Sequence, residues 1–335
     1  MGQKPLSRER CAEVVEAVLR SANVVAAARM LSTSRGAVEN ALRVAEVRYG
    51  MADPRDNRHT RARAYDPDTS PECSLTEAAS ARDAVAVCFG DAHWTTLEQP
   101  RSVAHEALLI ALRDVQPSHI IAMGDLMDMG EPSRHAPLMW GKRPSVRDEI
   151  NAAKRHLADI AATTPSAARY WVRGNHDDRF DKWLAQFAGS FDGIEGLSLE
   201  DHFPDWRLSW VLRFNEAFIT HRYHGGIHAG WNNAVKNGVT TITGDTHALN
   251  ITPTVDQRGR RWGVQCGMLG DPAWPAFHYM LGNTRLWTPG FVVLTWRNGT
   301  LLPPETCEVV DGVAWFRGQA LAGKPRVRVK ARTAA

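Results

Sequence analysis

Long apolar runs are missing from this chain of 335 residues. None approaches the roughly 20 consecutive apolar residues that a membrane-spanning helix needs. The polar start, residues 1–10, lacks the apolar stretch of a secretory signal. We therefore expect no membrane association and a cytoplasmic location. Cysteine is also scarce, because the five cysteines are odd in number and show no paired metal-ligand spacing. This argues against both a disulfide framework and a cysteine zinc site.

Acidic side chains are absent from the C-terminal end. Residues 319–335 carry 5 Lys and Arg and no Asp or Glu, and residues 1–64 carry 12 basic against 7 acidic side chains. Residues 65–318 carry 30 acidic against 23 basic side chains. Basic ends around an acidic centre suggest that the ends meet something anionic, while the centre holds carboxylates for cations. Ordinary solvated surface charge would give the same pattern.

Composition divides the chain into four parts. Residues 1–50 have a helical pattern with little Gly or Pro. Residues 51–83 are polar and punctuated by proline, with too few large apolar residues to bury a core, which predicts a flexible linker. Residues 84–318 alternate short apolar strands with helical stretches, the pattern of an α/β sheet domain. Residues 319–335 are predicted to be a basic tail.

The first region is predicted to form three short helices. Residues 7–21 carry an apolar stripe, residues 24–31 are rich in alanine, and a tight break at residues 32–34 precedes the third helix. This arrangement resembles helix-turn-helix DNA-binding domains. The resemblance makes Arg35, Asn40 and Arg43 candidate DNA-binding residues on the third helix. A small helical module for oligomerisation or protein contact would show the same pattern.

Metal-ligating side chains follow five predicted strands of the central region, mostly after a glycine. The strands are residues 84–89, 119–123, 168–173, 217–220 and 239–243, and they run into Asp91-Ala92-His93, Asp125 with Asp128, Asn175-His176-Asp177, His221, and Asp245-Thr246-His247. Strand carboxyl ends of an α/β sheet converge on one crevice, so these side chains should meet. In extended backbone, Asp91 and His93 would point to the same side and reach one ion. Asp, Asn and His together suit Mn²⁺, Fe²⁺ or Zn²⁺ better than Ca²⁺.

This ordered set resembles the calcineurin-like metallophosphoesterase superfamily. The pattern of that family is Asp-x-His, Gly-Asp-x-x-Asp, Gly-Asn-His-Asp/Glu, His, then Gly-His-x-His. The match covers roughly residues 84–318, and the segments at residues 267–272 and 287–291 look like the phage and prophage branch. The resemblance implies a β-sandwich flanked by helices, an α/β (α+β) fold, with a dinuclear metal centre at the strand carboxyl ends.

The resemblance also implies a role for each matched residue. Six residues would bind the metals, with Asp91, His93 and His247 on the first, Asn175 and His221 on the second, and Asp125 on both. His176 would not be a ligand but would donate to the phosphate or protonate the leaving oxygen, oriented by an acidic residue such as Asp128. We expect two divalent ions, Mn²⁺ above all, with Fe²⁺, Zn²⁺ or Mg²⁺ as alternatives. A hydroxide held between the two ions would attack phosphorus in line.

Two positions are open. Where the family pattern has the first histidine of Gly-His-x-His, this chain has Asp245. Asp245 either replaces that histidine as an oxygen ligand, favouring a harder ion such as Mn²⁺, or marks a weak second site. His221 directly follows its strand, as the ligand should, whereas His224 would be the ligand if the strand ended later. Elsewhere, His105 and His156 lie on helical patterns and are predicted to be surface residues.

The sequence predicts a metal-dependent phosphoesterase, most specifically a phosphodiesterase or nuclease acting on DNA. A helix-turn-helix in the same chain would raise the local concentration of DNA. Alternating basic residues in the tail could track a phosphate backbone. The alternatives are a phosphomonoesterase on a phosphoprotein or small molecule, and a non-catalytic DNA-binding regulator. A homo-oligomer is compatible with the sequence, and a partner ATPase stays unidentified.

Overall fold

The computed structural model describes residues 6–21, 24–49, 72–74, 82–135, 143–284 and 286–325. The chain divides into two compact units, residues 1–70 and residues 71–335. No helix in these described ranges is long and apolar enough to cross a membrane.

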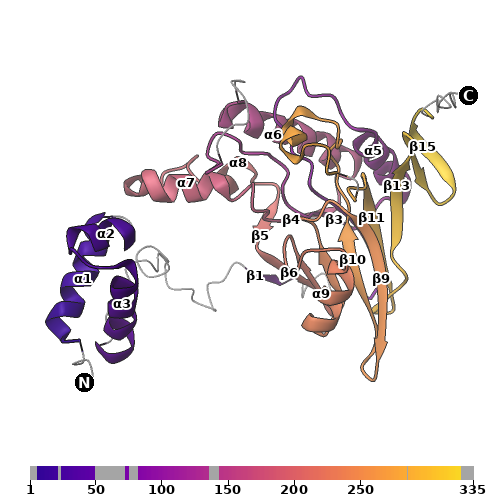
Figure 1. The fold of residues 1–335 in the computed structure, drawn as a ribbon. Coiled ribbons are helices and arrows are strands. Elements are labelled where there is room, and N and C mark those ends of the chain that lie inside the picture. The colour runs from indigo at the N-terminus through magenta and orange to yellow at the C-terminus, as the bar shows by residue number, and fades with distance from the viewer. Residues whose placement is uncertain are drawn as a thin grey trace, which may run out of the picture. The chain divides into compact units, whose positions relative to one another are not determined.

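The described part of the first unit contains three helices, α1 (Arg8–Ser21), α2 (Val24–Met30) and α3 (Arg35–Tyr49) (Figure 1). Small and aliphatic side chains from all three form its core: Val14, Ala17, Val18, Ala27, Ala28, Val38, Ala41 and Leu42. The Ser34 hydroxyl accepts a hydrogen bond from the Ala37 N–H (3.2 Å), which helps to start α3 after the turn. The three predicted helices are therefore present.

The outer face of α3 is polar and exposed. Arg35 pairs with Glu39 (Nε to Oε1, 2.8 Å), and Arg43 donates to the Asn40 side-chain oxygen (3.2 Å). Arg35, Asn40 and Arg43 are all exposed to solvent. Their contact with DNA stays a prediction.

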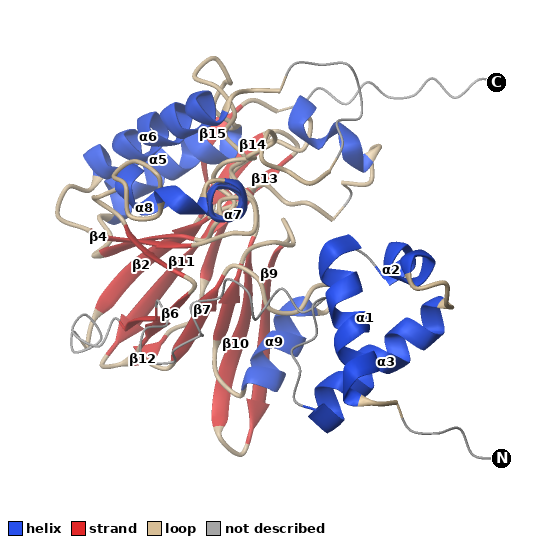
Figure 2. Cartoon of the chain, turned by 90° about the vertical axis from the view of Figure 1, so that its left-hand side faces the viewer, coloured by secondary structure: helices blue, strands red, loops and turns tan. Residues whose placement is uncertain are grey.

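The second unit is built on two stacked sheets (Figures 1 and 2). The six-stranded sheet has the order β1 (Glu72–Ser74), β6 (Val211–Phe214), β7 (Ala217–Thr220), β8 (Thr241–Thr243), β10 (Gly259–Cys266), β9 (Leu249–Asp256). The nine-stranded sheet has the order β15 (Gln319–Gly323), β14 (Val313–Phe316), β13 (Glu305–Val310), β11 (Gly290–Arg297), β2 (Ala84–Phe89), β3 (His119–Ala122), β4 (Ala168–Val172), β5 (Arg207–Ser209), and β12 (Thr300–Leu301) pairs with β11. Among the described residues of this unit, the α-helices are α5 (Val103–Val115), α6 (Val146–Thr163), α7 (Arg179–Phe187), α8 (Leu199–His202) and α9 (Ala229–Asn237). The predicted β-sandwich flanked by helices is confirmed.

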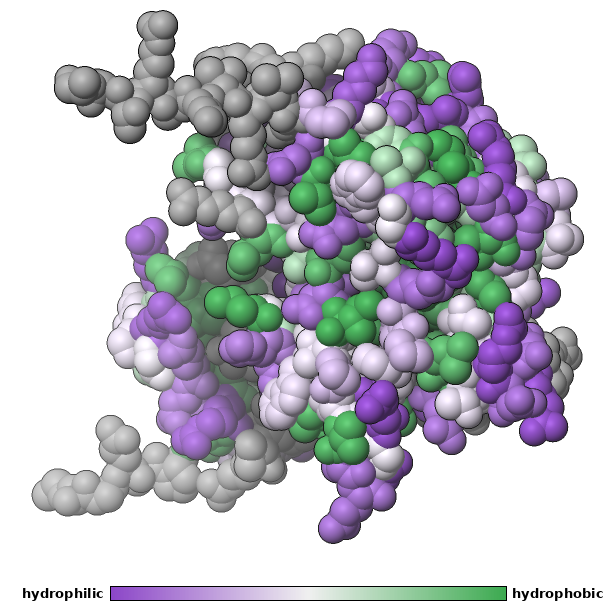
Figure 3. All heavy atoms as spheres, turned by 90° about the vertical axis from the view of Figure 1, so that its right-hand side faces the viewer, coloured by the Kyte–Doolittle hydropathy of each residue, from purple (hydrophilic) through white to green (hydrophobic). Residues whose placement is uncertain are grey.

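Two apolar layers hold this unit together. Along β2, Ala86 and Cys88 face the layer between the sheets, while Val87 and Phe89 face the layer under α5 and α6. This alternation follows from the two-residue period of a strand. Strands β2 to β5 are parallel to one another, and β2 and β3 are buried on both faces, which explains their continuous apolar runs. The face shown in Figure 3 mixes hydrophilic and hydrophobic residues, as solvated surfaces do.

Two element boundaries differ from those predicted. Glu72–Ser74, inside the predicted linker, forms β1 parallel to β6, and Gln319–Gly323, inside the predicted tail, forms β15 antiparallel to β14. Both are edge strands, which are held largely by main-chain hydrogen bonds and need little apolar surface, so composition does not reveal them. Most of the predicted linker, residues 51–71 and 75–81, and the end of the tail, residues 326–335, lie outside the described residues.

Candidate active site

The predicted site residues follow the carboxyl ends of five strands and meet where the two sheets come together. Strands β2, β3 and β4 belong to the nine-stranded sheet, and β7 and β8 belong to the six-stranded sheet. The residues after them form three groups whose ligand atoms lie within 4.8 Å of one another: Asp91, His93 and His247; Asp91, Asp125 and His221; and His93, Asp128 and His176. The fold therefore brings together residues that the strand pattern in the sequence predicted to meet.

The first group brings a carboxylate and two imidazoles to one point. Asp91 Oδ1 lies 3.2 Å from His247 Nε2, and His93 Nε2 lies 3.3 Å from the same nitrogen. His93 Nδ1 lies 3.2 Å from Asp128 Oδ1, so the proton of His93 belongs on Nδ1 and its Nε2 carries a lone pair. Lone pairs that face one another at this distance are favourable only around a shared cation or proton.

The second group contains two carboxylates and one imidazole. His221 Nε2 lies 3.3 Å from Asp125 Oδ2, and His221 Nδ1 donates to the Met123 carbonyl (2.6 Å). This second bond directs the Nε2 of His221 into the cluster. Asp91 belongs to both groups, whereas Asp125 belongs only to the second, so the bridging role of Asp125 stays a prediction.

The structure places the residues of the two open positions differently relative to the cluster. His221 reaches the cluster, whereas the His224 N–H donates to the Asn233 side chain (3.0 Å) and its ring contacts Tyr223. Asp245 lies at the edge of the cluster, with Oδ1 3.9 Å from His221 Nε2 and Oδ2 3.4 Å from Arg222 Nε. Whether Asp245 replaces a histidine ligand stays a prediction.

Buried acceptors without donors indicate that the cluster is suited to bind cations. In the described part of the chain, both Asp91 oxygens and Asn175 Oδ1 are buried and make no hydrogen bond. Such groups are costly to bury unless something compensates them. Burial opposes protonation of His221, yet the charges of Asp125 and Asp91 raise its pKa to about 10. The site therefore has an excess of negative charge, and its oxygen and imidazole donors suit divalent ions.

The backbone at the ligands is left-handed, not extended. Five site residues have positive φ: Asp91 (50°), His93 (47°), Asp125 (49°), Asp245 (64°) and His247 (55°). The expectation of an extended Asp91-Ala92-His93 segment is therefore wrong. The chain turns at these five residues, which follow β2, β3 and β8, and Asp and His tolerate this conformation better than most residues. The side chains converge because of these turns and not because of strand alternation.

His176 lies beside the candidate metal ligands, and its ring is held by Asp128 and Arg179. Its Nδ1 lies 2.8 Å from the Asp128 carbonyl and 3.2 Å from Asp128 Oδ1, as the predicted orienting role of Asp128 requires. Arg179 Nη2 approaches its Nε2 at 3.0 Å. Burial opposes protonation of His176, but the charges of Asp125 and Asp128 raise its pKa above the usual value. A histidine of this kind is suited to hold and release a proton.

Comparison with known proteins agrees with this geometry. Residues 85–251 match the model of the calcineurin-like phosphoesterase family. This part of the chain is a calcineurin-like phosphoesterase domain. The gene 54 protein of Mycobacterium phage L5 is 26% identical over 239 residues, which cover 62% of this chain and 88% of the phage protein. The gene 54 protein of Mycobacterium phage D29 is 27% identical over 240 residues, with the same coverage.

Among solved structures, a dimetal phosphatase from Danio rerio has a TM-score of 0.32 and 10% identity, and the match covers 72% of this chain and 99% of that chain. The family assignment rests on the sequence match, and it makes the chain a metal-dependent phosphoesterase. The predicted resemblance to phage proteins is confirmed by the two relatives.

Sequence reasoning gave no role to Asp177, which fixes the loops of the phosphoesterase domain. Its buried carboxylate accepts hydrogen bonds from five N–H groups: the backbone of Asp125 (2.8 Å), Leu126 (3.0 Å), Met127 (3.3 Å) and Gly174 (3.0 Å), and Trp171 Nε1 (3.1 Å). Burial and the charge of Asp125 raise the pKa of Asp177 to about 6. Sequence reasoning also gave no role to Arg179, which contacts Asp128 and His176. Its position two residues after Asp177, close to the motif, could have drawn attention to it.

Gly174 is required because Asp125 occupies the space of a side chain. A Cβ on residue 174 would overlap both the carboxylate and the backbone nitrogen of Asp125. We expect Gly174→Ala to destabilise the phosphoesterase domain by about 1–3 kcal/mol, since overpacking of a dense site forces backbone shifts. Displaced Asp125 should also lower turnover more than about tenfold, because small misplacements at a reacting centre are costly.

Thermal unfolding and metal-dependent turnover would test this effect of Gly174→Ala. Gly225→Ala is the control, because a Cβ at residue 225 meets no atom within 4 Å. Equal behaviour of the two variants would contradict the expectation.

Glu149 makes stability depend on pH. Its buried carboxylate accepts from the N–H groups of Met129 and Gly130, and burial, followed by the charge of Asp128, raises its pKa to about 8. In the unfolded chain the pKa of Glu149 would be about 4.3. Between about pH 4.3 and pH 8, the folded state therefore holds a proton on Glu149 that the unfolded state lacks. The stabilisation from this proton is complete below about pH 4.3 and is lost as pH rises through 8.

We therefore expect Glu149→Gln to reduce the loss of unfolding free energy between pH 5 and pH 8 by a few kcal/mol, measured by urea unfolding. Glu106→Gln, an exposed position on α5, should leave that loss unchanged. If wild type and Glu149→Gln lost the same free energy over this range, Glu149 would already be ionised in the folded state.

Proposed function

We propose that this chain is a phosphodiesterase that cleaves DNA. One observation carries the proposal: the phosphoesterase domain shares its chain with a three-helix unit whose α3 exposes Arg35, Asn40 and Arg43. Side chains of this kind on a helix after a tight turn can contact bases and phosphates. Such a unit would hold DNA near the metal centre and raise its local concentration.

In this proposal, some site residues bind the metal ions and His176 handles the proton of the leaving group. Two divalent cations, Mn²⁺ in our proposal, would be held by Asp91, His93, Asp125, Asn175, His221 and His247, and they would supply an activated nucleophile and positive charge at the phosphoryl oxygens. Asp245 would add a carboxylate oxygen to the second site. Asp128 orients His176 through Nδ1, which leaves Nε2 for the leaving oxygen.

Arg179 has two roles in this proposal. Its guanidinium donates to the Asp128 carbonyl (Nη1, 2.7 Å) and lies against His176 Nε2. A phosphoryl oxygen is a better acceptor for arginine than an imidazole nitrogen, because it is charged. Substrate binding would therefore draw Arg179 toward the phosphate and free His176 Nε2 to hold the proton that the leaving alkoxide needs.

The test compares four substrates with the full chain and Mn²⁺: labelled single-stranded DNA, labelled double-stranded DNA, a generic phosphodiester and a generic phosphomonoester. We expect cleavage of DNA and of the diester. Substituting Arg35→Ala together with Arg43→Ala should weaken DNA cleavage about tenfold or more at low substrate, since each lost charged contact weakens binding. Turnover of the small diester should not change.

Arg20→Ala is the matched control, because Arg20 is an exposed arginine on α1 of the same unit. Turnover of the monoester alone would instead identify a phosphatase. DNA binding without turnover on any substrate would identify a DNA-binding regulator. Equal DNA cleavage by wild type and the double variant would remove the three-helix unit from the proposal.

A further inference from the structure

Apart from the candidate metal centre, a hollow lies on the six-stranded sheet, at the opposite end of its strands. Its lining includes Ala217, the first residue of β7, and Thr240, the residue before β8, whereas the site residues His221 and Asp245 follow the ends of those strands. The four residues of β7 span about 13 Å, so the two places are separate. The hollow has a volume of about 500 Å³, within the range of small-molecule sites.

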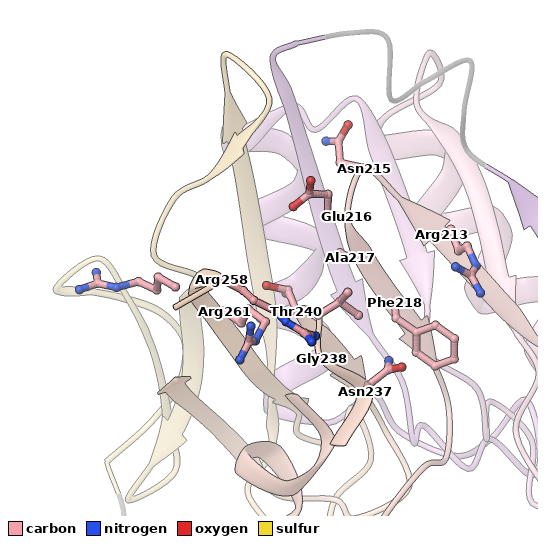
Figure 4. A pocket seen from close by; sticks show the side chains of 12 residues that line it. Arg213, Asn215, Glu216, Ala217, Phe218, Asn237, Gly238, Thr240, Arg258 and Arg261 are labelled. Atoms are coloured by element: carbon pink, nitrogen blue, oxygen red, sulfur yellow. The ribbon is translucent and has the colours of Figure 1, made fainter. Parts of the chain in front are cut away.

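The lining of this hollow is strongly basic. It holds four arginines, Arg213, Arg258, Arg260 and Arg261, and one acidic residue, Glu216. Figure 4 labels Arg213, Arg258, Arg261 and Glu216. Such a basic lining is unusual in a region, residues 65–318, whose acidic side chains outnumber its basic ones by 30 to 23. Arg261 pairs with Asp256, whereas Arg258 and Arg260 bring two further positive charges to the cavity, which attract an anion.

Arg258 and Arg260 are exposed, and within the described residues no acidic side chain pairs with either guanidinium. The guanidinium of Arg260 lies over the ring of Trp262, 5.7 Å from its centroid, which holds its stem in place without using its hydrogen-bond donors. These two side chains therefore keep their charge available for a ligand.

Two buried donors in the lining have no acceptor. Arg261 is buried, with an exposed fraction of 8%. Both of its terminal nitrogens bind Asp256, but its Nε makes no hydrogen bond. The side-chain nitrogen of Asn215 is also buried and makes none. A buried donor left without an acceptor is costly, and the cost is removed when a ligand supplies acceptor oxygens.

We propose that this arginine hollow, the cavity lined by Arg213, Asn215, Arg258, Arg260 and Arg261, binds the phosphate groups of a nucleotide, free or within a strand. Phosphate carries the negative charge that the guanidinium groups match and several acceptor oxygens for the unpartnered donors. Phe218 adds an aromatic face to the lining, against which Arg213 lies with its guanidinium 5.8 Å from the ring centroid. An aromatic surface beside a phosphate site favours a nucleotide over inorganic phosphate.

The experiment measures binding with the full chain in EDTA, so that the metal centre neither coordinates nor cleaves the probe. The probes are a fluorescent ADP analogue and a short labelled oligodeoxythymidylate. We expect Arg258→Glu together with Arg260→Glu to weaken binding of at least one probe about tenfold or more, since two charge-assisted contacts become repulsive. The control is Arg113→Glu, an exposed arginine on α5 outside the hollow.

Weakened binding of the ADP analogue would identify a free nucleotide as the ligand, and weakened binding of the oligonucleotide alone would identify a strand. Unchanged melting temperature and unchanged Mn²⁺-dependent turnover of a generic diester would show that the fold and the metal centre are intact. If the charge-reversed pair does not fold, the pair Arg258→Gln and Arg260→Gln is used. The proposal would be overturned if the paired substitution weakened the binding of both probes no more than Arg113→Glu does. This outcome does not depend on which substrate the metal centre cleaves.

Discussion

Replacing His176 with alanine is expected to slow cleavage of DNA by about 10²- to 10⁴-fold, the usual contribution of a positioned general acid. The leaving group in DNA is an alkoxide, which needs a proton as the P–O bond breaks. His176 is placed to give that proton because Asp128 holds its Nδ1 and leaves Nε2 beside Asp125. Metal binding should persist, since His176 is not one of the proposed ligands.

The leaving group separates this role from a general loss of activity. A phosphodiester with a nitrophenolate leaving group needs no proton, so His176→Ala should lower its turnover far less than it lowers DNA cleavage. Single-turnover rates on both substrates, with bound metal measured by mass spectrometry, would show the difference. His224→Ala is the control, because His224 lies nearby but outside the cluster. Equal losses on the two substrates would exclude the proton-donor role.

Asp125→Asn is expected to lower metal-dependent turnover by about 10³-fold, because a metal ion supplies several kcal/mol of transition-state stabilisation. The change keeps the size of the side chain but removes its charge. In the wild type, Asp125 Oδ2 faces His221, and Oδ1 accepts the His176 N–H (2.8 Å). The variant should hold less metal per chain while the loops keep their places through Asp177.

Thermal unfolding gives a second measure of the same change. Mn²⁺ at about 100 times its dissociation constant should stabilise the wild type by about 2.7 kcal/mol, and Asp125→Asn should lose most of this gain. Asp205→Asn, an exposed position, should keep it. A variant that unfolds like the wild type with and without Mn²⁺, and binds as much metal, would show that Asp125 is not a ligand.

The location of the site could be predicted because each signal is local in sequence. An apolar strand followed by a ligand needs only a few residues, and the topology of parallel strands then brings the ends together. The same reasoning placed His221 ahead of His224. It could not find the role of Asp177, since a carboxylate that accepts five N–H bonds looks like any other Asp until the loops are folded around it.

Burial at the helices was harder to predict. His105 and His156 were expected at the surface, which is wrong: their exposed fractions are 0% and 6%, and both rings contact Trp94. Burial lowers the pKa of His105 to about 3, so it stays neutral. Helical periodicity identifies one apolar face, but α5 and α6 also pack against each other, and this second contact covers positions that the pattern assigns to solvent.

The left-handed backbone at five of the site residues affects how this enzyme can be dissected by mutagenesis. Aspartate and histidine both bind metals and tolerate positive φ. Each of these positions therefore needs a side chain that can coordinate and that can also adopt the left-handed backbone. Alanine has no ligand atom and disfavours positive φ. Each alanine substitution would therefore cost about 1 kcal/mol of backbone strain in addition to the loss of the ligand. Asparagine keeps the turn while removing the charge or the imidazole. Asparagine replacements would therefore report the loss of the charge or the imidazole without added strain, although the amide oxygen can still coordinate, as proposed for Asn175.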